Sequence, residues 1–188
     1  MNKVDVRDAL FDAITDLAKE DKGIILMTAD MGAWGLTKFR QHLPEQFINV
    51  GIAEQNLVSV AAGLALAGKK PFIYSIAAFV TGRCYDQIKV DLCQMNLPVT
   101  IIGSGPGLLY GSEGPTHHTT SDVVIMSVLP NMTIYTVRTA DEAVQAVAIA
   151  YASKSPVYIR IAKDGLMKTY GQYKDPYHDM PFEVKSGI

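Results

Sequence analysis

Residues 49–56 read Asn-Val-Gly-Ile-Ala-Glu-Gln-Asn and join a short apolar strand to a long helix of small residues. The strand side is apolar from Phe47 to Val50, and the helix side, residues 53–68, is apolar on every face. We therefore expect this helix to be buried. Glu54 enters it in the first turn, in a region with little to solvate a charge, where a carboxyl favours its protonated form. Such an acid can exchange a proton near neutral pH, although a first-turn glutamate can also simply complement the helix dipole.

Strands and helices alternate along the chain to about residue 165. Apolar positions at helical spacing predict helices over residues 5–20, 53–68, 82–95 and 139–153. Continuous apolar runs predict strands over residues 23–28, 47–50, 71–75, 98–103, 132–137 and 156–160. Short strands of this kind between helices indicate a parallel sheet covered on both faces, which is an α/β fold of three α/β/α layers.

The carboxyl ends of these strands are the expected location of a site, because ligands of parallel sheets bind beyond those ends. Four residues stand there: Asp30, Ser75, Gly103 and Arg160. We therefore expect polar chemistry to gather along one edge of the sheet.

The domain boundary is predicted near residue 165. Beyond it, residues 168–180 hold three tyrosines, a histidine, a proline and scattered charges without any periodicity. The pattern predicts one domain over residues 1–165 and a linker over residues 166–188.

The composition argues against several classes of protein. The chain has 188 residues, of which 48% are hydrophobic and 19% charged, as in an ordinary globular domain. Its net charge of −2 argues against a nucleic-acid face or a polybasic membrane patch. No apolar run is long enough to span a membrane, and charges between Lys3 and Asp8 break any signal-peptide core. We therefore expect a cytoplasmic protein that binds neither nucleic acid nor membranes.

Two cysteines, Cys84 and Cys93, lie nine residues apart on the helix predicted over residues 82–95. Nine steps of about 100° place them on opposed faces, too far apart for a disulfide. No spacing typical of zinc ligands is present. We expect two small buried hydrophobes, and no metal site on this chain.

The run Gly-Ile-Ala-Glu-Gln-Asn at 51–56, followed by Ala-Ala-Gly-Leu-Ala at 61–65, resembles a known motif. It is similar to the glutamate motif in the pyrimidine-binding domain of transketolases and deoxyxylulose phosphate synthases, which use thiamine diphosphate. The resemblance covers about residues 1–165. It implies that Glu54 is catalytic and shares a proton with the aminopyrimidine ring of the cofactor. It also implies that the linker leads to a C-terminal domain absent from this sequence.

The resemblance also implies which residues line the cofactor. Residues 77–83, Ala-Ala-Phe-Val-Thr-Gly-Arg, look like the family segment that supplies stacking aromatics. Phe79 is the first candidate for that wall and Tyr74 the second, while Ile76 stands where transketolases often have a phenylalanine. A core position is the alternative for Phe79. Asp30 resembles an acid that lies near the cofactor across the dimer interface.

The substrate-binding residues are implied by further matches. Residues 112–118, Ser-Glu-Gly-Pro-Thr-His-His, resemble the Asp-Gly-Pro-Thr-His loop of transketolase, with Glu113 in place of the aspartate. His117 is implied as a catalytic and substrate-binding residue beside Glu113; a solvated loop histidine is the alternative. Arg160 matches an arginine that binds the substrate phosphate, or it makes an interface salt bridge. Arg7 corresponds loosely to another phosphate-binding arginine, or is a helix-surface residue.

The family holds the diphosphate through Mg²⁺ bound after a Gly-Asp-Gly sequence, and this chain has no Gly-Asp-Gly. The resemblance therefore implies half of a split transketolase whose partner chain holds Mg²⁺ and the diphosphate, in a homodimer or heterotetramer. Alone, the chain is expected to bind thiamine diphosphate weakly or not at all. With its partner it would transfer a two-carbon ketol unit from a ketose, or ketose phosphate, to an aldose, or aldose phosphate. A deoxyxylulose phosphate synthase-like enzyme, a 2-oxoacid dehydrogenase β-type component and a non-catalytic partner-binding module are the alternatives.

Overall fold

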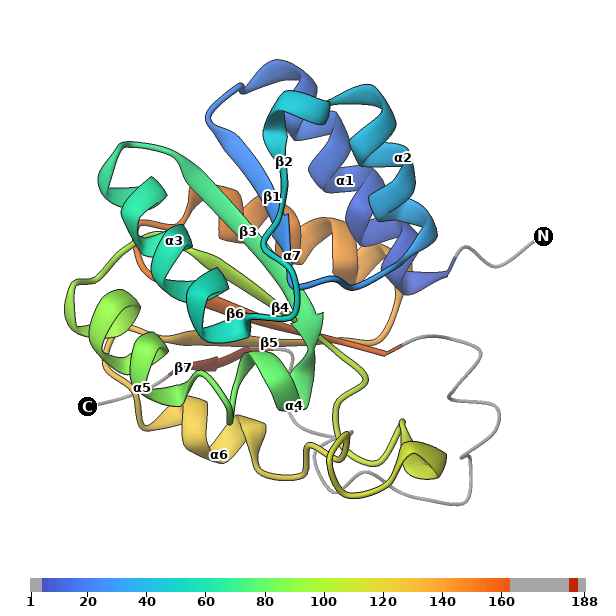
Figure 1. Cartoon of the computed structure of the whole chain (residues 1–188), viewed down its shortest axis with the longest axis vertical. Coiled ribbons are helices and arrows are strands. Elements are labelled where there is room, and N and C mark those ends of the chain that lie inside the picture. Colours follow the sequence, from blue (N-terminus) through green and yellow to red (C-terminus); the bar gives the residue numbers. More distant parts are fainter. Residues whose placement is uncertain (1–4, 163–182, 186–188) are drawn as a thin grey trace.

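The computed structural model describes residues 5–162 and 183–185 (Figure 1). Six parallel strands form the sheet: β1 (Ile24–Thr28), β2 (Phe47–Asn49), β3 (Lys70–Ile76), β4 (Thr100–Ser104), β5 (Thr133–Val137) and β6 (Val157–Ile161). A seventh strand, β7 (Glu183–Lys185), pairs antiparallel with β5, and the sheet order is β2-β1-β3-β4-β6-β5-β7. The six predicted strands are all present.

Helices cover both faces of the sheet, which confirms the predicted three-layer α/β/α fold. One face carries α1 (Val6–Glu20), α2 (Trp34–His42) and α7 (Ala140–Ala152). The other carries α3 (Glu54–Leu66), the π-helix η2 (Ile88–Gln94) and α6 (Asp122–Ser127). Figure 1 shows α1 and α2 together on one side, with α3, α5 and α6 on the other.

The two layers of helices pack against alternate side chains of the same strands. On β1, Ile24 and Leu26 join the core under α1 and α7, whereas Ile25 and Met27 join the core under α3 and η2. Strands send successive side chains to opposite faces, so a run that is apolar at every position supplies both cores. The continuous hydrophobicity of the strands is therefore the cause of the three-layer arrangement.

Helix α3 departs from the prediction, because only one of its sides is buried in this chain. Leu57, Val58 and Ala61 are fully buried against the sheet. On the outer side, Leu66 is 62% exposed and Val60 is also exposed. No described element covers that side, so the expectation of a fully buried helix is wrong for the single chain.

The helix predicted over residues 82–95 is divided, and α2, α4 (Ala77–Val80) and α6 were not predicted. A turn at residues 81–84 precedes α5 (Tyr85–Gln87), which continues directly into η2. A π-helix turns less per residue than an α-helix, so the face of each side chain shifts. Cys84 lies in the turn and Cys93 in η2, so they do not share one regular helix, and both lie in the same core; both are buried free thiols, as expected.

The C-terminal segment is only partly described. The boundary at residue 165 and the aperiodic residues 168–180 lie outside the described residues. Residues 183–185, within the predicted linker, form strand β7 at the edge of the sheet. Within the described part of the chain, no helix combines the length and the hydrophobicity needed to cross a bilayer.

Burial raises the pKa of the Cys84 and Cys93 thiols to about 12, with the Glu54 charge adding to the effect at Cys84. At pH 8 only about one thiol in 10⁴ would then be ionised. We predict that iodoacetamide leaves the native protein unlabelled and modifies both thiols in urea, measured by intact mass. Rapid alkylation of the native protein would contradict this.

Candidate active site

Glu54 is positioned by the connection from β2 to α3. Gly51 adopts a positive φ of 77°, which turns the chain sharply after the strand, and α3 begins three residues later. The Glu54 side chain is 4% exposed, as the sequence predicted for a buried acid. Its Oε2 lies 3.1 Å from Nη1 of Arg83, a partner that the sequence did not predict.

Arg83 connects Glu54 to a cluster of three aromatic rings that follow β3 and β4 in the chain. Its guanidinium carbon lies 4.2 Å from the centre of the Phe79 ring, which belongs to α4. The Phe79 and His117 rings meet edge to face at 4.9 Å, and His117 meets Tyr110 in the same way at 5.9 Å. Three of the predicted residues, Glu54, Phe79 and His117, are thus brought together in one chain of contacts.

Phe79 lies at the surface of this cluster and not within the protein core. Its side chain is half-buried, and it belongs to neither of the two core clusters. Ile76, the last residue of β3, lies three positions earlier and is 8% exposed. The core alternative for Phe79 is therefore not supported, and the Arg83 guanidinium lies over a face of its ring.

The loop after β4 holds His117 in place. Gly107 and Thr119 exchange two backbone hydrogen bonds of 2.9 and 2.8 Å, which close the loop at its base. Gly105 has a positive φ of 69°, and a Cβ there would stand 2.0 Å from the Tyr110 ring. Tyr110 can pack against this backbone only because residue 105 is glycine.

Glu113 lies in the same loop but outside the contact chain. It is exposed, and its carboxylate accepts a hydrogen bond of 3.3 Å from the neighbouring Ser112 hydroxyl. His117 Nδ1 lies 2.9 Å from the Thr116 hydroxyl, and His118 Nε2 lies 3.4 Å from the Gly111 carbonyl oxygen. His117, not His118, is therefore the histidine that faces Phe79.

Tyr74 does not fit the role of a stacking wall. Its ring is fully buried on the α1 side of the sheet, where it meets Phe11 edge to face at 5.0 Å. Burial raises the pKa of the Tyr74 phenol, and the nearby Ser104 and Arg7 oppose that effect. The ring has no free face for a ligand, so we correct this prediction.

Arg160 also lies away from the cluster. Its guanidinium is 0% exposed and donates to both oxygens of Asp122, from Nε at 2.7 Å and from Nη2 at 3.1 Å. Nη1 donates to the Thr136 hydroxyl at 3.0 Å, and Tyr158 also donates to Asp122 at 2.8 Å. A guanidinium with no exposed surface cannot contact a substrate phosphate in this conformation. The ion pair instead lies inside the chain and joins β6 to α6.

Arg7 lies at the start of α1, on the same side of the sheet as Tyr74. It is half-buried, and its Nε makes no hydrogen bond to any described residue. The Arg7 charge lies close enough to Tyr74 to act on the pKa of that phenol. Arg7 is therefore not a simple helix-surface residue, but no contact joins it to Glu54 or His117.

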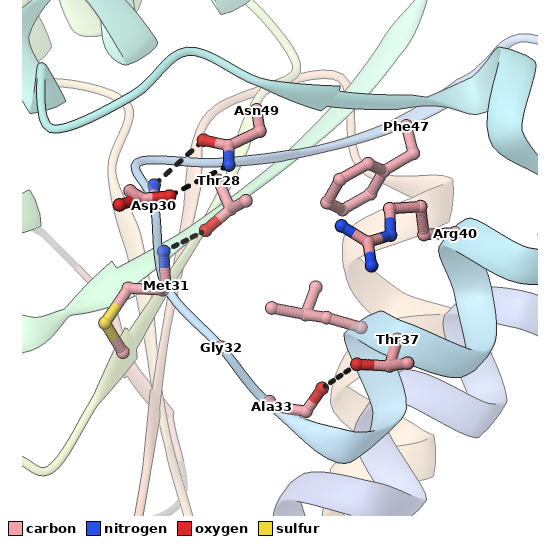
Figure 2. Close-up of a pocket in the computed structure, with 10 residues that line it drawn as sticks. Thr28, Asp30, Met31, Gly32, Ala33, Thr37, Arg40, Phe47 and Asn49 are labelled. Carbon is pink, nitrogen blue, oxygen red and sulfur yellow. Dashed lines mark hydrogen bonds between the residues drawn. The ribbon is translucent and has the colours of Figure 1, made fainter.

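Asp30 lies in a separate pocket of about 280 Å³ between α2 and the ends of β1 and β2 (Figure 2). Its backbone has a positive φ of 54° and is held by Asn49. The Asp30 amide donates to Asn49 Oδ1 at 3.0 Å, and Asn49 Nδ2 donates to Asp30 Oδ1 at 3.1 Å. Figure 2 shows Arg40 and Phe47 across the cavity. None of Glu54, Phe79 and His117 lines this pocket.

Arg83 and Tyr110 are the site residues that the sequence did not single out. Arg83 ends the run 77–83 that was chosen for its aromatic residue. A charged side chain four residues after Phe79 was the available signal. Tyr110 stands in a loop rich in glycine, where its position depends on close backbone contact that no pattern predicts.

The described residues contain no group of three or more His, Cys, Asp or Glu side chains arranged to hold a metal ion. Glu54 and Phe79 do fit a flat heterocycle, because a buried carboxylate stands beside a partly exposed ring. The arrangement can hold a planar group that donates an N–H to Glu54 and stacks on Phe79.

Comparison with known proteins places these observations in a family. Residues 2–168 match the family model for the transketolase, pyrimidine binding domain. The chain is 35% identical over 170 residues to one subunit of the apulose-4-phosphate transketolase of Phocaeicola vulgatus, covering 90% of this chain and 54% of that protein. It is 41% identical over 152 residues to the 1-deoxy-D-xylulose-5-phosphate synthase of Clostridium perfringens, covering 79% of this chain and 24% of the synthase.

One solved structure has a comparable sequence identity to this chain. A split gene transketolase, in the form of an inactive beta4 tetramer, superposes with a TM-score of 0.76 at 34% identity. The match covers 86% of this chain and 52% of that one. The chain thus spans about half the length of these transketolase chains and about a quarter of the synthase.

The Arg160–Asp122 pair should be important for stability. Asp122→Asn would leave the guanidinium charge buried without its counterion, and we predict a loss of about 3–5 kcal/mol in the free energy of unfolding. Urea denaturation measures this. Asp16→Asn, which breaks the exposed pair with Lys19, is the matched control and should change stability far less. Equal effects of the two changes would contradict the prediction.

Proposed function

This chain belongs to the family of transketolase pyrimidine-binding domains, and on that premise we propose that it is the pyrimidine-binding subunit of a split, thiamine diphosphate-dependent transketolase. The observation that carries the proposal is the Glu54 carboxylate, 4% exposed at the start of α3 and paired with a planar group that lies on Phe79. A site that offers those two contacts suits an aminopyrimidine ring.

The proposed reaction moves a two-carbon ketol unit from a ketose, or its phosphate, to an aldose, or its phosphate. Thiamine diphosphate supplies the carbon–carbon bond chemistry when it is bound. Glu54 would hold a proton at a ring nitrogen, and Phe79 with Ile76 would form the wall behind the ring. His117 would orient the oxygen of the sugar at which bonds change, since its ring lies beside Phe79.

The remaining predicted residues lie outside the Glu54–Phe79–His117 group in this proposal. Glu113 is exposed in the His117 loop, where it can accept hydrogen bonds from sugar hydroxyls. Arg7 lies in the first turn of α1, where its Nε makes no hydrogen bond to a described residue, and it would bind a substrate anion. Asp30, held by Asn49, would lie near the cofactor where a second subunit meets this one. The structure gives no support for Tyr74 or Arg160 as binding residues.

A partner chain would complete the site. This sequence lacks Gly-Asp-Gly, and its described residues contain no carboxylate cluster for Mg²⁺. We infer that another polypeptide holds Mg²⁺ and the diphosphate. The relative from Phocaeicola vulgatus is itself one subunit of a transketolase, which supports a two-chain enzyme.

A second copy of this chain would cover the outer side of α3. Val60 and Leu66 are exposed there beside Gly63, and small residues permit close approach of two helices. An isologous pairing of two copies would bury this face on both. With the partner chain, the assembly would be a heterotetramer.

A synthase acting on pyruvate is the second candidate, favoured by the 41% identity to the deoxyxylulose phosphate synthase. A 2-oxoacid dehydrogenase β-type component is a related alternative, and the same experiment tests it. Release of carbon dioxide from pyruvate would support these alternatives, whereas consumption of a ketose donor with an aldehyde acceptor supports transketolation.

We predict that the protein, purified from its own cells at low salt with magnesium, travels with a second chain carrying Gly-Asp-Gly and with bound thiamine diphosphate. Native mass spectrometry measures both. If the chain is found alone and without cofactor, the catalytic proposal loses its main support.

In the assembled enzyme, Glu54→Gln should lower turnover by about 10²-fold or more, because the amide cannot exchange the proton. Steady-state rates with a ketose donor measure this, and circular dichroism checks the fold. Glu45→Gln, at an exposed position, is the matched control and should leave the rate unchanged. Near-normal activity of the Glu54 variant would show that the assignment is wrong.

A further inference from the structure

We propose that the Arg83 side chain occupies the place of the cofactor's aminopyrimidine ring in the cofactor-free chain, so that Arg83 and the ring compete for Glu54 and Phe79. The inference rests on the proposed function, since it needs the pyrimidine to bind between these two residues. It adds a residue that sets how readily the site accepts its cofactor.

The geometry of Arg83 supports this substitution. One guanidinium nitrogen lies 3.1 Å from the Glu54 carboxylate, while the guanidinium carbon lies 4.2 Å from the centre of the Phe79 ring. A single planar group thus makes the two contacts that the proposed function gives to the pyrimidine. Both groups cannot use the same carboxylate oxygen and the same face of the ring at once.

The chemistry of the two groups is also alike. A guanidinium is flat, donates N–H groups in its own plane and stacks on aromatic faces. An aminopyrimidine that holds a proton on its ring nitrogen has the same three properties. Glu54 and Phe79 therefore recognise a flat N–H donor, and Arg83 is the one that this chain itself provides.

Exposure shows which member of the pair can leave. The Arg83 side chain is 43% exposed and the Glu54 side chain 4%. Among the described residues, the Arg83 guanidinium donates a hydrogen bond only to Glu54, and it lies over the Phe79 ring. Glu54 is fixed in the first turn of α3, so the arginine is the partner that can swing into solvent.

The Arg83–Glu54 ion pair stabilises the chain before the cofactor binds. A carboxylate that is almost fully buried is costly without a counterion. Arg83 supplies that counterion in the cofactor-free chain, and a bound ring would take over the contact. The expected cost is weaker apparent binding, because only the fraction of molecules with Arg83 displaced can bind the ring.

The competition predicts a gain of affinity on removal of Arg83. If the pair is formed in about 80–90% of molecules, Arg83→Ala should bind the ring about five- to tenfold more tightly. The probe is 4-amino-5-hydroxymethyl-2-methylpyrimidine, titrated into the full chain and followed by NMR. Arg83→Gln, which keeps the length without the charge, should also gain, whereas Lys89→Ala, an exposed loss of the same charge, should not.

Two further measurements separate competition from a structural effect. In the wild type, the side-chain Nε–H signal of Arg83 should move to the position of a free arginine as the ring is added. The gain in Arg83→Ala should disappear in the double variant with Glu54→Gln, since the two groups compete for that carboxylate.

The outcomes distinguish the inference from the proposed function. Equal or weaker binding by Arg83→Ala overturns the competition while leaving the pyrimidine site in place. An Arg83 signal that stays fixed while the ring binds overturns it as well. If neither the wild type nor Arg83→Ala binds the ring, the competition is overturned, whereas the proposed function is tested separately by the turnover of Glu54→Gln in the assembled enzyme.

Discussion

Strands β1 to β6 all run in one direction, and the location of the candidate site residues depends on that constraint. A parallel sheet brings all its strand ends to one edge, so residues far apart in the sequence meet there without any local signal. Glu54 follows β2, Phe79 follows β3 and His117 follows β4. The backbone at this edge is not regular: Gly51 and Gly105 have positive φ, and so does Asp30. The regular sheet fixes the place of the site, and these irregular turns fix the directions of its side chains.

Two buried acids show how differently one charge pair can be used. Asp122 and Arg160 are both 0% exposed and are satisfied on several sides, by Thr136 and Tyr158 as well as by each other. Such a pair cannot open without unfolding its surroundings. Among the residues that the structure describes, Glu54 has one hydrogen-bonding partner, Arg83, whose side chain reaches solvent. The first pair fixes the structure, and the second leaves a buried carboxylate that can accept another partner.

The sequence predicted the fold well because the strands are apolar at every position and the helices separate them. The family resemblance is confirmed, as are the six strands and the three layers. The predictions failed where packing across the sheet decides the outcome. Tyr74 was expected to line a pocket, but its position on β3 turns it toward Phe11 in the core. Arg160 was expected to bind substrate, but no pattern in the sequence shows that Asp122 lies opposite it.

The candidate site was predicted only in part, because some of its contacts depend on packing that the sequence does not show. Glu54, Phe79 and His117 were found through motifs, and the structure connects them through a series of side-chain contacts. Their catalytic and binding roles stay predictions. Arg83 was missed because its importance depends on a contact with Glu54, 29 residues away in the sequence, made while its guanidinium lies over the Phe79 ring. The two cysteines were correctly expected to be buried, but the turn at Cys84 divides the predicted helix, so they do not lie on opposed faces of one helix.

Helix α3 has one further consequence. It carries Glu54 at its first residue, and Val60 and Leu66 stand exposed on its outer side. A rigid helix moves as one body, so whatever settles against that outer side also sets the orientation of the acid at its tip. Under the proposed pairing of two copies, the state of the site would therefore depend on protein concentration, even though Glu54 itself lies within a single polypeptide.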